Sequence, residues 1–140
     1  MNLLTDPVFS VREAASQNIK NLVGVFGVSW AQNSILPRVL EFSTNPNYLF
    51  RMTTLLSINA VTTVVTSDVV INTLLPITLQ LVTDPVPNIR FNVAKTLNSI
   101  SAVIEPSNHA LVAPALEKLL QDPDPDVKFF ATQAWNAIKS

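Results

Sequence analysis

The sequence predicts an all-α fold, an α-α superhelix (a solenoid) of about three and a half helical hairpins. One observation behind this prediction is a motif of Asp or Asn followed by Pro, with Arg or Lys six residues after the Asp or Asn. Its four copies begin at residues 6, 45, 84 and 122, at steps of 39, 39 and 38 residues. A second observation is that two helix-like apolar patterns fall within each period. We therefore expect one array, with units of roughly 1–27, 28–66, 67–106 and 107–140.

The first helix of each complete unit is short and has a proline near its start. The apolar pattern predicts these helices at roughly Ile35–Thr44, Ile71–Thr83 and Ala110–Gln121. The prolines are Pro37, Pro76 and Pro114. Proline is tolerated in the first turn of a helix, but it bends a helix that began earlier. The sequence leaves both alternatives open.

The second helices are longer, and their apolar residues fall in register from unit to unit. They are expected at roughly Ser10–Phe26, Tyr48–Val65, Asn88–Ile104 and Asp126–Lys139. One column of equivalent positions contains Val11, Phe50, Ile89 and Val127, and another contains Ile19, Ile58, Leu97 and Trp135. These columns lie eight residues apart, which places them on one face of a helix. We expect them to form the core, with Trp135 either in the core or at the exposed end of the array.

The charged residues of the motif are expected to form a structural ladder between stacked units. Its members are Asp6, Arg12, Asn45, Arg51, Asp84, Arg90, Asp122 and Lys128. An Arg near a turn can bond to a carboxylate and to free carbonyls at the same time. The alternative is a set of solvated ion pairs, each worth less than about 1 kcal/mol. The fourfold recurrence favours the ladder and argues against a catalytic role.

The Asp/Asn-Pro turns inside the units carry side chains that folding does not explain. These are Phe9 in the first turn, Asn47 and Tyr48 in the second, and Val86 and Pro87 in the third. Exposed aromatic side chains often anchor a partner protein. Alternatively, Phe9 and Tyr48 pack back against the next unit as hydrophobic staples. The two interpretations are equally weighted for Phe9, whereas partner contact is favoured for Tyr48.

The composition excludes several classes of protein. No apolar run is long enough to span a membrane, and the first residues do not form a secretory signal. The chain has no cysteine, which excludes disulfides and fits a protein of the cytoplasm and also of the nucleus. The net charge of −1, with nine scattered basic residues, does not favour binding of nucleic acid or of an anionic membrane.

No residue pattern indicates catalysis, a cofactor or a metal. The one histidine, His109, stands at the start of an expected helix without other metal ligands nearby. Asp122, Asp124 and Asp126 have the alternation of a calcium loop, but the glycine and distal glutamate of such a loop are absent. We interpret the three acids as a turn followed by a helix N-cap. The chain is therefore not expected to be an enzyme.

The repeat resembles a known family. A proline in the first helix, Asp or Asn at the turn and a basic residue in the second helix resemble the HEAT repeat. Longer strings, such as Asn45-Pro46-Asn47-Tyr48-Leu49 and Arg90-Phe91-Asn92-Val93-Ala94-Lys95, resemble the scaffold (A) subunits of serine/threonine protein phosphatase 2A. This resemblance covers nearly the whole chain and is more specific than that of a generic helical repeat.

The resemblance implies a non-catalytic scaffold that holds a phosphatase catalytic subunit. In that family the turns of the C-terminal repeats contact the catalytic subunit, so Phe9, Asn47, Tyr48, Val86 and Pro87 become the candidate contacts. The turn at 122–126 belongs to the same set. Regulatory B-type subunits would bind repeats that this chain lacks, and Met1 would not be the natural beginning.

Two other functions are alternatives to the scaffold. A helical-repeat adaptor or transport receptor would bind cargo peptides through acidic, Trp or Asn ladders on its inner helices, and the apolar columns contain no such ladder. An enzyme is disfavoured because no acid–base pair or nucleophile can be placed.

Overall fold

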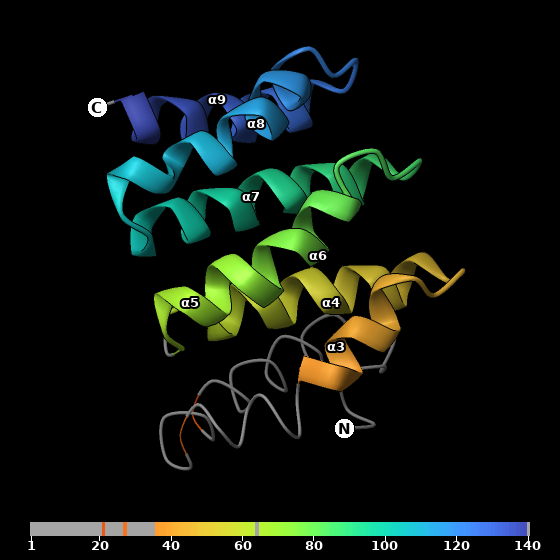
Figure 1. The fold of residues 1–140 in the computed structure, drawn as a ribbon. Helices are drawn as coiled ribbons and strands as arrows, with labels where there is room; N and C mark the ends of the chain where they lie inside the picture. The colour runs from red at the N-terminus through yellow and green to blue at the C-terminus, as the bar shows by residue number, and fades with distance from the viewer. Residues whose placement is uncertain (1–20, 22–26, 28–35, 64, 140) are drawn as a thin grey trace. The chain divides into compact units, whose positions relative to one another are not determined.

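The computed structural model describes residues 21, 27, 36–63 and 65–139. The chain divides into two compact units, Met1–Thr66 and Ser67–Ser140. All regular secondary structure within the described ranges is helical, which confirms the predicted all-α class (Figure 1). The predicted helix at Ser10–Phe26 lies outside the described residues except for Asn21, which is helical.

The described part of the first unit is a helical hairpin. Helix α3 (Leu36–Ser43) is followed by a turn and by α4 (Tyr48–Val61). Val39 of α3 is buried, and its carbonyl accepts a hydrogen bond from Thr54 Oγ1 of α4 at 3.4 Å. Phe42 and Phe50 meet edge to face, with ring centroids 5.3 Å apart. These contacts explain why the two helices pack along their apolar faces.

The second unit contains two helical hairpins. Its elements are α5 (Ser67–Val69), the π-helix η3 (Val70–Leu74), α6 (Leu75–Gln80), α7 (Pro87–Val103), the 3₁₀ helix η4 (Pro106–Leu111), α8 (Ala113–Leu120) and α9 (Pro125–Lys139). Helix α7 packs against α9, and α8 packs against both (Figure 1). Their shared core consists of small and branched side chains that are almost completely buried: Ile89, Val93, Ala94, Leu97, Ile100, Leu116, Leu119, Val127, Ala131 and Ala134.

The prolines of the first helices do not behave alike. Pro114 stands in the first turn of α8, just after η4, and so begins its helix. Pro76 instead lies inside a continuous helical stretch from Ser67 to Gln80. The stretch widens into a π-helix immediately before this proline, where the N–H of Leu75 bonds to the carbonyl of Val70. A wider turn accommodates the proline ring, which would clash with a regular α-helical turn.

Several predicted boundaries were wrong by a few residues. The first helix expected to begin at Ile71 begins at Ser67, because the π-turn lets the chain stay helical before Pro76. The helix expected at Ala110–Gln121 is split into η4 and α8, because Pro114 cannot bond backward into a preceding turn. The long helix expected to end at Val65 ends at Val61.

Among the members of the two core columns that the structure describes, two are not fully buried. Ile58 and Leu97 are inaccessible to solvent, but Phe50 and Trp135 are only half-buried. The ammonium of Lys139 lies over the Trp135 ring, 4.7 Å from the centroid. Trp135 therefore lies beside the core instead of within it.

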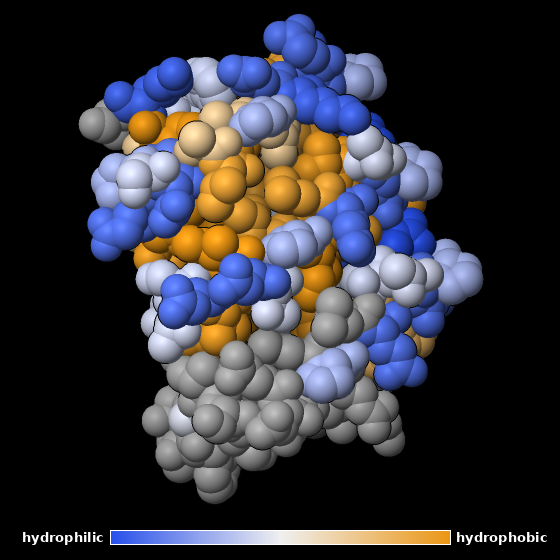
Figure 2. Space-filling view, in the orientation of Figure 1, coloured by the Kyte–Doolittle hydropathy of each residue, from blue (hydrophilic) through white to orange (hydrophobic). Residues whose placement is uncertain are grey.

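Hydrophobic side chains also reach the surface. Figure 2 shows them gathered over the face of the second unit that carries α6 and α8. Leu111 of η4 is 44% exposed. No helix in the described ranges is long and apolar enough to cross a membrane.

Candidate functional site: the turns inside the repeats

The three described turns are built in the same way. In each, the side-chain oxygen of the first Asp or Asn accepts a hydrogen bond from the backbone N–H two residues later. The pairs are Asn45 with Asn47, Asp84 with Val86 and Asp122 with Asp124, each at 2.9 Å. The proline between them cannot extend the first helix. The motif thus ends one helix and directs the chain into the next.

The turns differ in how the second helix is capped. Asn47 Oδ1 accepts from the N–H of Leu49 at 2.9 Å. Asp124 Oδ1 accepts from the N–H groups of Asp126 at 2.9 Å and Val127 at 3.2 Å. Val86 occupies the equivalent position in the middle turn, and it is an N-cap with no side-chain hydrogen bond. Ser, Thr, Asp and Asn are the residues that normally stabilise this position.

Each described arginine of the motif closes its own turn. The Nη1 of Arg51 donates to the carbonyls of Asn45 at 2.9 Å and Pro46 at 3.0 Å. The Nη1 of Arg90 donates to the carbonyl of Asp84 at 2.8 Å. These carbonyls are free because the first helix has ended there.

Arg90 also joins two consecutive turns. Its Nε donates to Asp122 Oδ2 at 2.7 Å and its Nη2 donates to Asp122 Oδ1 at 3.2 Å, a bidentate ion pair between residues 32 positions apart. The Asp122 side chain is only 8% exposed and that of Arg90 only 15%. Solvent therefore screens this pair less than a surface salt bridge.

The ion pair shifts the pKa of both partners. Burial by itself raises the pKa of Asp122, but the hydrogen bonds from Arg90 and from the Asp124 N–H outweigh it, and the pKa is lowered. The charges of Arg90 and Lys128 act in the same direction. The hydrogen bond to Asp122 raises the pKa of Arg90 against the opposing effect of burial. Both groups are therefore held in their charged forms.

The structure brings some of the predicted ladder residues together and leaves another exposed. It brings Asp84, Arg90 and Asp122 together at adjacent turns. Lys128 is exposed, and within the described part of the chain its ammonium has no hydrogen-bonded partner. Asp6 and Arg12 lie outside the described residues.

A surface cavity of about 430 Å³ lies between the two turns of the second unit. Val82, Pro85, Leu119 and Pro123 provide apolar walls. Arg90, Lys118, Asp84 and Asp122 provide charged groups of both signs. The cavity thus offers a partner both an apolar and a charged lining.

The predicted contact residues on the turns are accessible. Tyr48 is 42% exposed, Asn47 and Pro87 are exposed, and Val86 is half-buried. Phe9 lies outside the described residues. The exposure of Tyr48 differs from what a hydrophobic staple would show, since a staple is buried against its neighbour.

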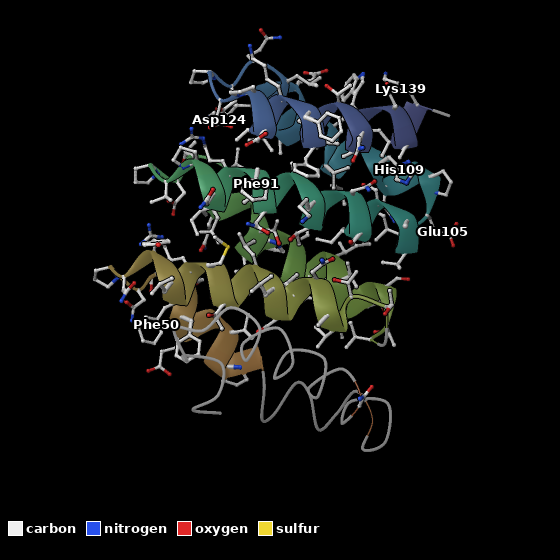
Figure 3. The ribbon with its side chains drawn as sticks, turned by 180° about the vertical axis from the view of Figure 1, so that it is seen from behind. Phe50, Phe91, Glu105, His109, Asp124 and Lys139 are labelled. Atoms are coloured by element: carbon white, nitrogen blue, oxygen red, sulfur yellow. The ribbon has the colours of Figure 1, made fainter. Side chains whose placement is uncertain are left out.

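The residues considered for metal chemistry have structural partners. Nε2 of His109 lies 2.9 Å from the carbonyl of Ser101, which links η4 to α7. Asp122 and Asp124 accept hydrogen bonds from backbone N–H groups. Figure 3 labels His109 and Asp124 at different ends of their hairpin. In the ranges that the structure describes, no group of three His, Cys, Asp or Glu residues is placed to hold a metal ion.

Sequence reasoning missed a set of exposed residues on the second helices. Phe129 is 57% exposed, and Asn98 and Asn136 are exposed at equivalent positions of α7 and α9. The repeat period contains the signal, because residues 59, 98 and 136 are all Asn. Comparing the apolar columns alone does not reveal it. These three asparagines occupy equivalent positions of the repeat, each one residue after a member of an apolar column. The apolar columns themselves contain no asparagine.

Comparisons with known proteins agree with the repeat. The HEAT repeat profile matches residues 74–104 and 112–140. A designed armadillo repeat protein has a similar fold, with a TM-score of 0.60 at 19% identity over 98% of this chain and 62% of that one. This likeness confirms the helical-repeat solenoid, and at such low identity it concerns the fold alone.

Two relatives carry closer sequence similarity. A regulatory A-type subunit of protein phosphatase PP2A from Saccharomyces cerevisiae is 41% identical over 124 residues, which are 82% of this chain and 20% of that protein. The serine/threonine-protein phosphatase PP2A 65 kDa regulatory subunit of Drosophila melanogaster is 59% identical over 46 residues, 32% of this chain and 8% of that protein. The chain spans at most about a fifth of the length of these relatives. The chain therefore contains HEAT repeats at residues 74–104 and 112–140, and it is similar in sequence to the A-type regulatory subunits of PP2A.

Proposed function

We propose that this chain is a non-catalytic scaffold of a serine/threonine phosphatase holoenzyme, whose turns bind the catalytic subunit. The relatives are named as regulatory subunits of PP2A, which supports this assignment. Regulatory B-type subunits would bind other repeats of such a scaffold. A cytoplasmic and nuclear location accompanies the proposal, as does the lack of any catalytic activity of the chain itself.

The observation that supports the proposal most directly is the valine at the N-cap of α7, Val86. Two of the three described turns place a capping oxygen at this position, but the middle turn places a half-buried valine there. An apolar residue at an N-cap forgoes about 1 kcal/mol of helix stability. Local rules are broken in this way where a residue serves function. Contact of Val86 and Pro87 with a partner protein explains the choice.

The neighbouring turn supports the same interpretation. Tyr48 exposes a large ring and a hydroxyl group directly after the cap Asn47. Tyr is favoured at the centre of protein interfaces because it buries a large area and keeps one polar group for a hydrogen bond. Tyr48 and Val86 belong to equivalent turns of successive repeats along the sequence.

The proposal is tested by measuring the affinity of the full chain for purified PP2A catalytic subunit by calorimetry. We expect the combined Phe9→Ala and Tyr48→Ala substitutions to weaken binding at least about tenfold, the usual effect of removing an interface anchor. Leu111→Ala is the matched control, because Leu111 is as exposed as Tyr48 but lies in η4, away from the turns. Helical content is checked by circular dichroism.

Wild-type affinity of the double variant would refute the contact assignment. Phosphatase turnover that co-purifies with the chain, and persists after every catalytic subunit has been removed, would refute the non-catalytic role. Equal weakening by Leu111→Ala would place the interface elsewhere on the molecule.

A further inference from the structure

One exposed surface on α7 and α9 carries aromatic rings that neither the turns nor the core uses. Phe91 of α7 stacks on Phe130 of α9, with centroids 5.5 Å apart, and Phe129 meets Phe130 edge to face at 5.3 Å. Phe91 and Phe130 are half-buried, but Phe129 is 57% exposed. Figure 3 shows α7 and α9 side by side, with Phe91 labelled on α7. The exposed part of the Phe129 ring gains no stabilisation from burial in the fold.

A single cation lies over these rings. The ammonium of Lys95 is 5.8 Å from the centroid of Phe91 and 5.1 Å from that of Phe130. These are cation–π distances, so the rings hold the lysine in place. Within the described part of the chain, Lys95 forms no ion pair with a carboxylate. It is therefore a positioned and exposed positive charge.

Two asparagines extend the surface along both helices. Asn98 follows Phe91 by seven residues, and Asn136 follows Phe129 by seven, so each lies two helical turns away on the same side. Both are exposed. An Asn amide donates and accepts hydrogen bonds, which suits the N–H and C=O groups of a peptide backbone. We define the α7–α9 surface by Phe91, Lys95, Asn98, Phe129, Phe130 and Asn136.

Charge is segregated onto these two helices. They contain four basic residues (Arg90, Lys95, Lys128 and Lys139) and one acidic residue (Asp126), although the whole chain has a net charge of −1. Arg90 is neutralised by Asp122, which leaves three lysines. A partner with negative charge is thus attracted to α7 and α9 more than to other described helices.

We propose that the α7–α9 surface binds an extended acidic segment of another protein that also carries an aromatic side chain. A carboxylate of the segment pairs with Lys95, and its aromatic ring packs on Phe129. The amides of Asn98 and Asn136 bond to its backbone. Nucleic acid and anionic membranes fit less well, since they require many phosphate-binding cations, whereas α7 and α9 carry three lysines and only one of them belongs to this surface. The inference does not depend on the turns or on the catalytic subunit.

The test uses the full chain and fluorescein-labelled synthetic peptides, with binding followed by fluorescence anisotropy. The first probe is built from repeated Glu-Glu-Phe-Gly units, the second from Gln-Gln-Phe-Gly and the third from Glu-Glu-Ala-Gly. We expect the first to bind at least about tenfold more tightly than the second, because charge-assisted hydrogen bonds are lost. The third should also bind more weakly, since it cannot stack on Phe129.

Variants of the chain locate the site. Lys95→Gln and Phe129→Ala should each weaken binding of the first peptide by about threefold or more. The matched controls are Lys118→Gln on α8 and Leu111→Ala in η4, both exposed and both outside the α7–α9 surface. They should leave the affinity unchanged. Raising the salt concentration should weaken binding of the first peptide but leave binding of the second peptide unchanged.

Four results would overturn the proposal. They are equal binding of the first and second peptides, no binding of any peptide at millimolar concentration, loss of binding in the controls as large as in Lys95→Gln, and tighter binding of phosphatidylserine vesicles or of single-stranded DNA than of the first peptide. Circular dichroism of Phe129→Ala and of Lys95→Gln verifies that the fold of each variant is intact.

Discussion

Arg90 combines two tasks through the fixed geometry of its guanidinium group. One nitrogen bonds to the free carbonyl of Asp84 in its own turn, and two others bond to the carboxylate of Asp122 in the next turn. A lysine could not make these three directed bonds, because its ammonium is a compact point charge. The residue therefore couples the end of one helical hairpin to the end of the following one.

Removing one partner of this pair should destabilise the protein. Asp122→Asn keeps an oxygen for the Asp124 N–H but loses the charge that neutralises a largely buried Arg90. We expect a loss of about 1–3 kcal/mol in the free energy of unfolding, measured by urea denaturation. Glu117→Gln, which alters an exposed acid on α8, is the control and should change the value by less than about 0.5 kcal/mol. A similarly small change in Asp122→Asn would show that the pair is not stabilising.

The lowered pKa of Asp122 predicts how the difference in unfolding free energy between the wild type and Asp122→Asn depends on pH. A carboxyl whose pKa is lower in the folded state stabilises that state above its unfolded pKa, which is about 4. The stabilisation is lost as the pH falls through the lower, folded value. The gap in unfolding free energy between the wild type and Asp122→Asn should stay constant from about pH 5 to 8 and shrink below about pH 4. A gap that instead widens in acid would contradict the assignment.

At the scale of elements, each turn repeats one design and varies one position. In the three described turns, the first Asp or Asn accepts a hydrogen bond from the N–H two residues later, so the end of the first helix is fixed in the same way. The cap of the second helix is the variable position, with Asn47, Val86 and Asp124 in successive turns. Under the proposed function, a capping side chain and a partner-contacting side chain are alternatives at this position.

Substitutions at the cap should separate the two effects. Asp124→Ala should lower the unfolding free energy by about 1 kcal/mol, because two N–H groups lose their acceptor. Val86→Asp should raise it by up to about 1 kcal/mol, since the extended backbone there (φ −90°, ψ 119°) suits a capping residue. If Val86 contacts the catalytic subunit, the same substitution should weaken that binding. A more stable variant with unchanged affinity would show that Val86 is not a contact.

At the scale of the whole molecule, the packing is mainly between near neighbours. The core shared by α7, α8 and α9 is nearly inaccessible to solvent and lies within the second unit. The stability of such arrays is roughly a sum of contributions from repeats and from the interfaces between neighbours. A part of the array that keeps complete hairpins should therefore keep its fold.

We expect a polypeptide of residues 67–140 to unfold cooperatively in urea. Its unfolding free energy should fall less steeply with urea concentration than that of the full chain, because unfolding exposes less surface. Circular dichroism provides the measurement, and two wavelengths reporting the same midpoint would support a two-state transition. A broad, sloping loss of signal would show that the second unit depends on the first.

Local features of the fold were predictable because each is encoded within a few residues. The Asp/Asn-Pro turns depend on a hydrogen bond that recurs in the three described turns, and the apolar columns such as Ile89 and Val127 depend on the sequence period. The boundaries near Pro76 and Pro114 were less predictable. Whether a proline begins a helix or is accommodated by a π-turn depends on the turn before it, and the pattern of apolar residues is the same in both cases.

The sequence by itself determined the repeat period, the helical hairpins and the positions of the turns, since these follow from spacing and backbone chemistry. Only the tertiary structure decided that Arg90 pairs with Asp122 while Lys128 stays exposed, because residues distant in sequence meet only once the helices have packed. It likewise decided that Phe129 faces solvent and Trp135 lies beside the core. Which helix a side chain packs against is decided when the repeats assemble, and the sequence of a single repeat does not encode it.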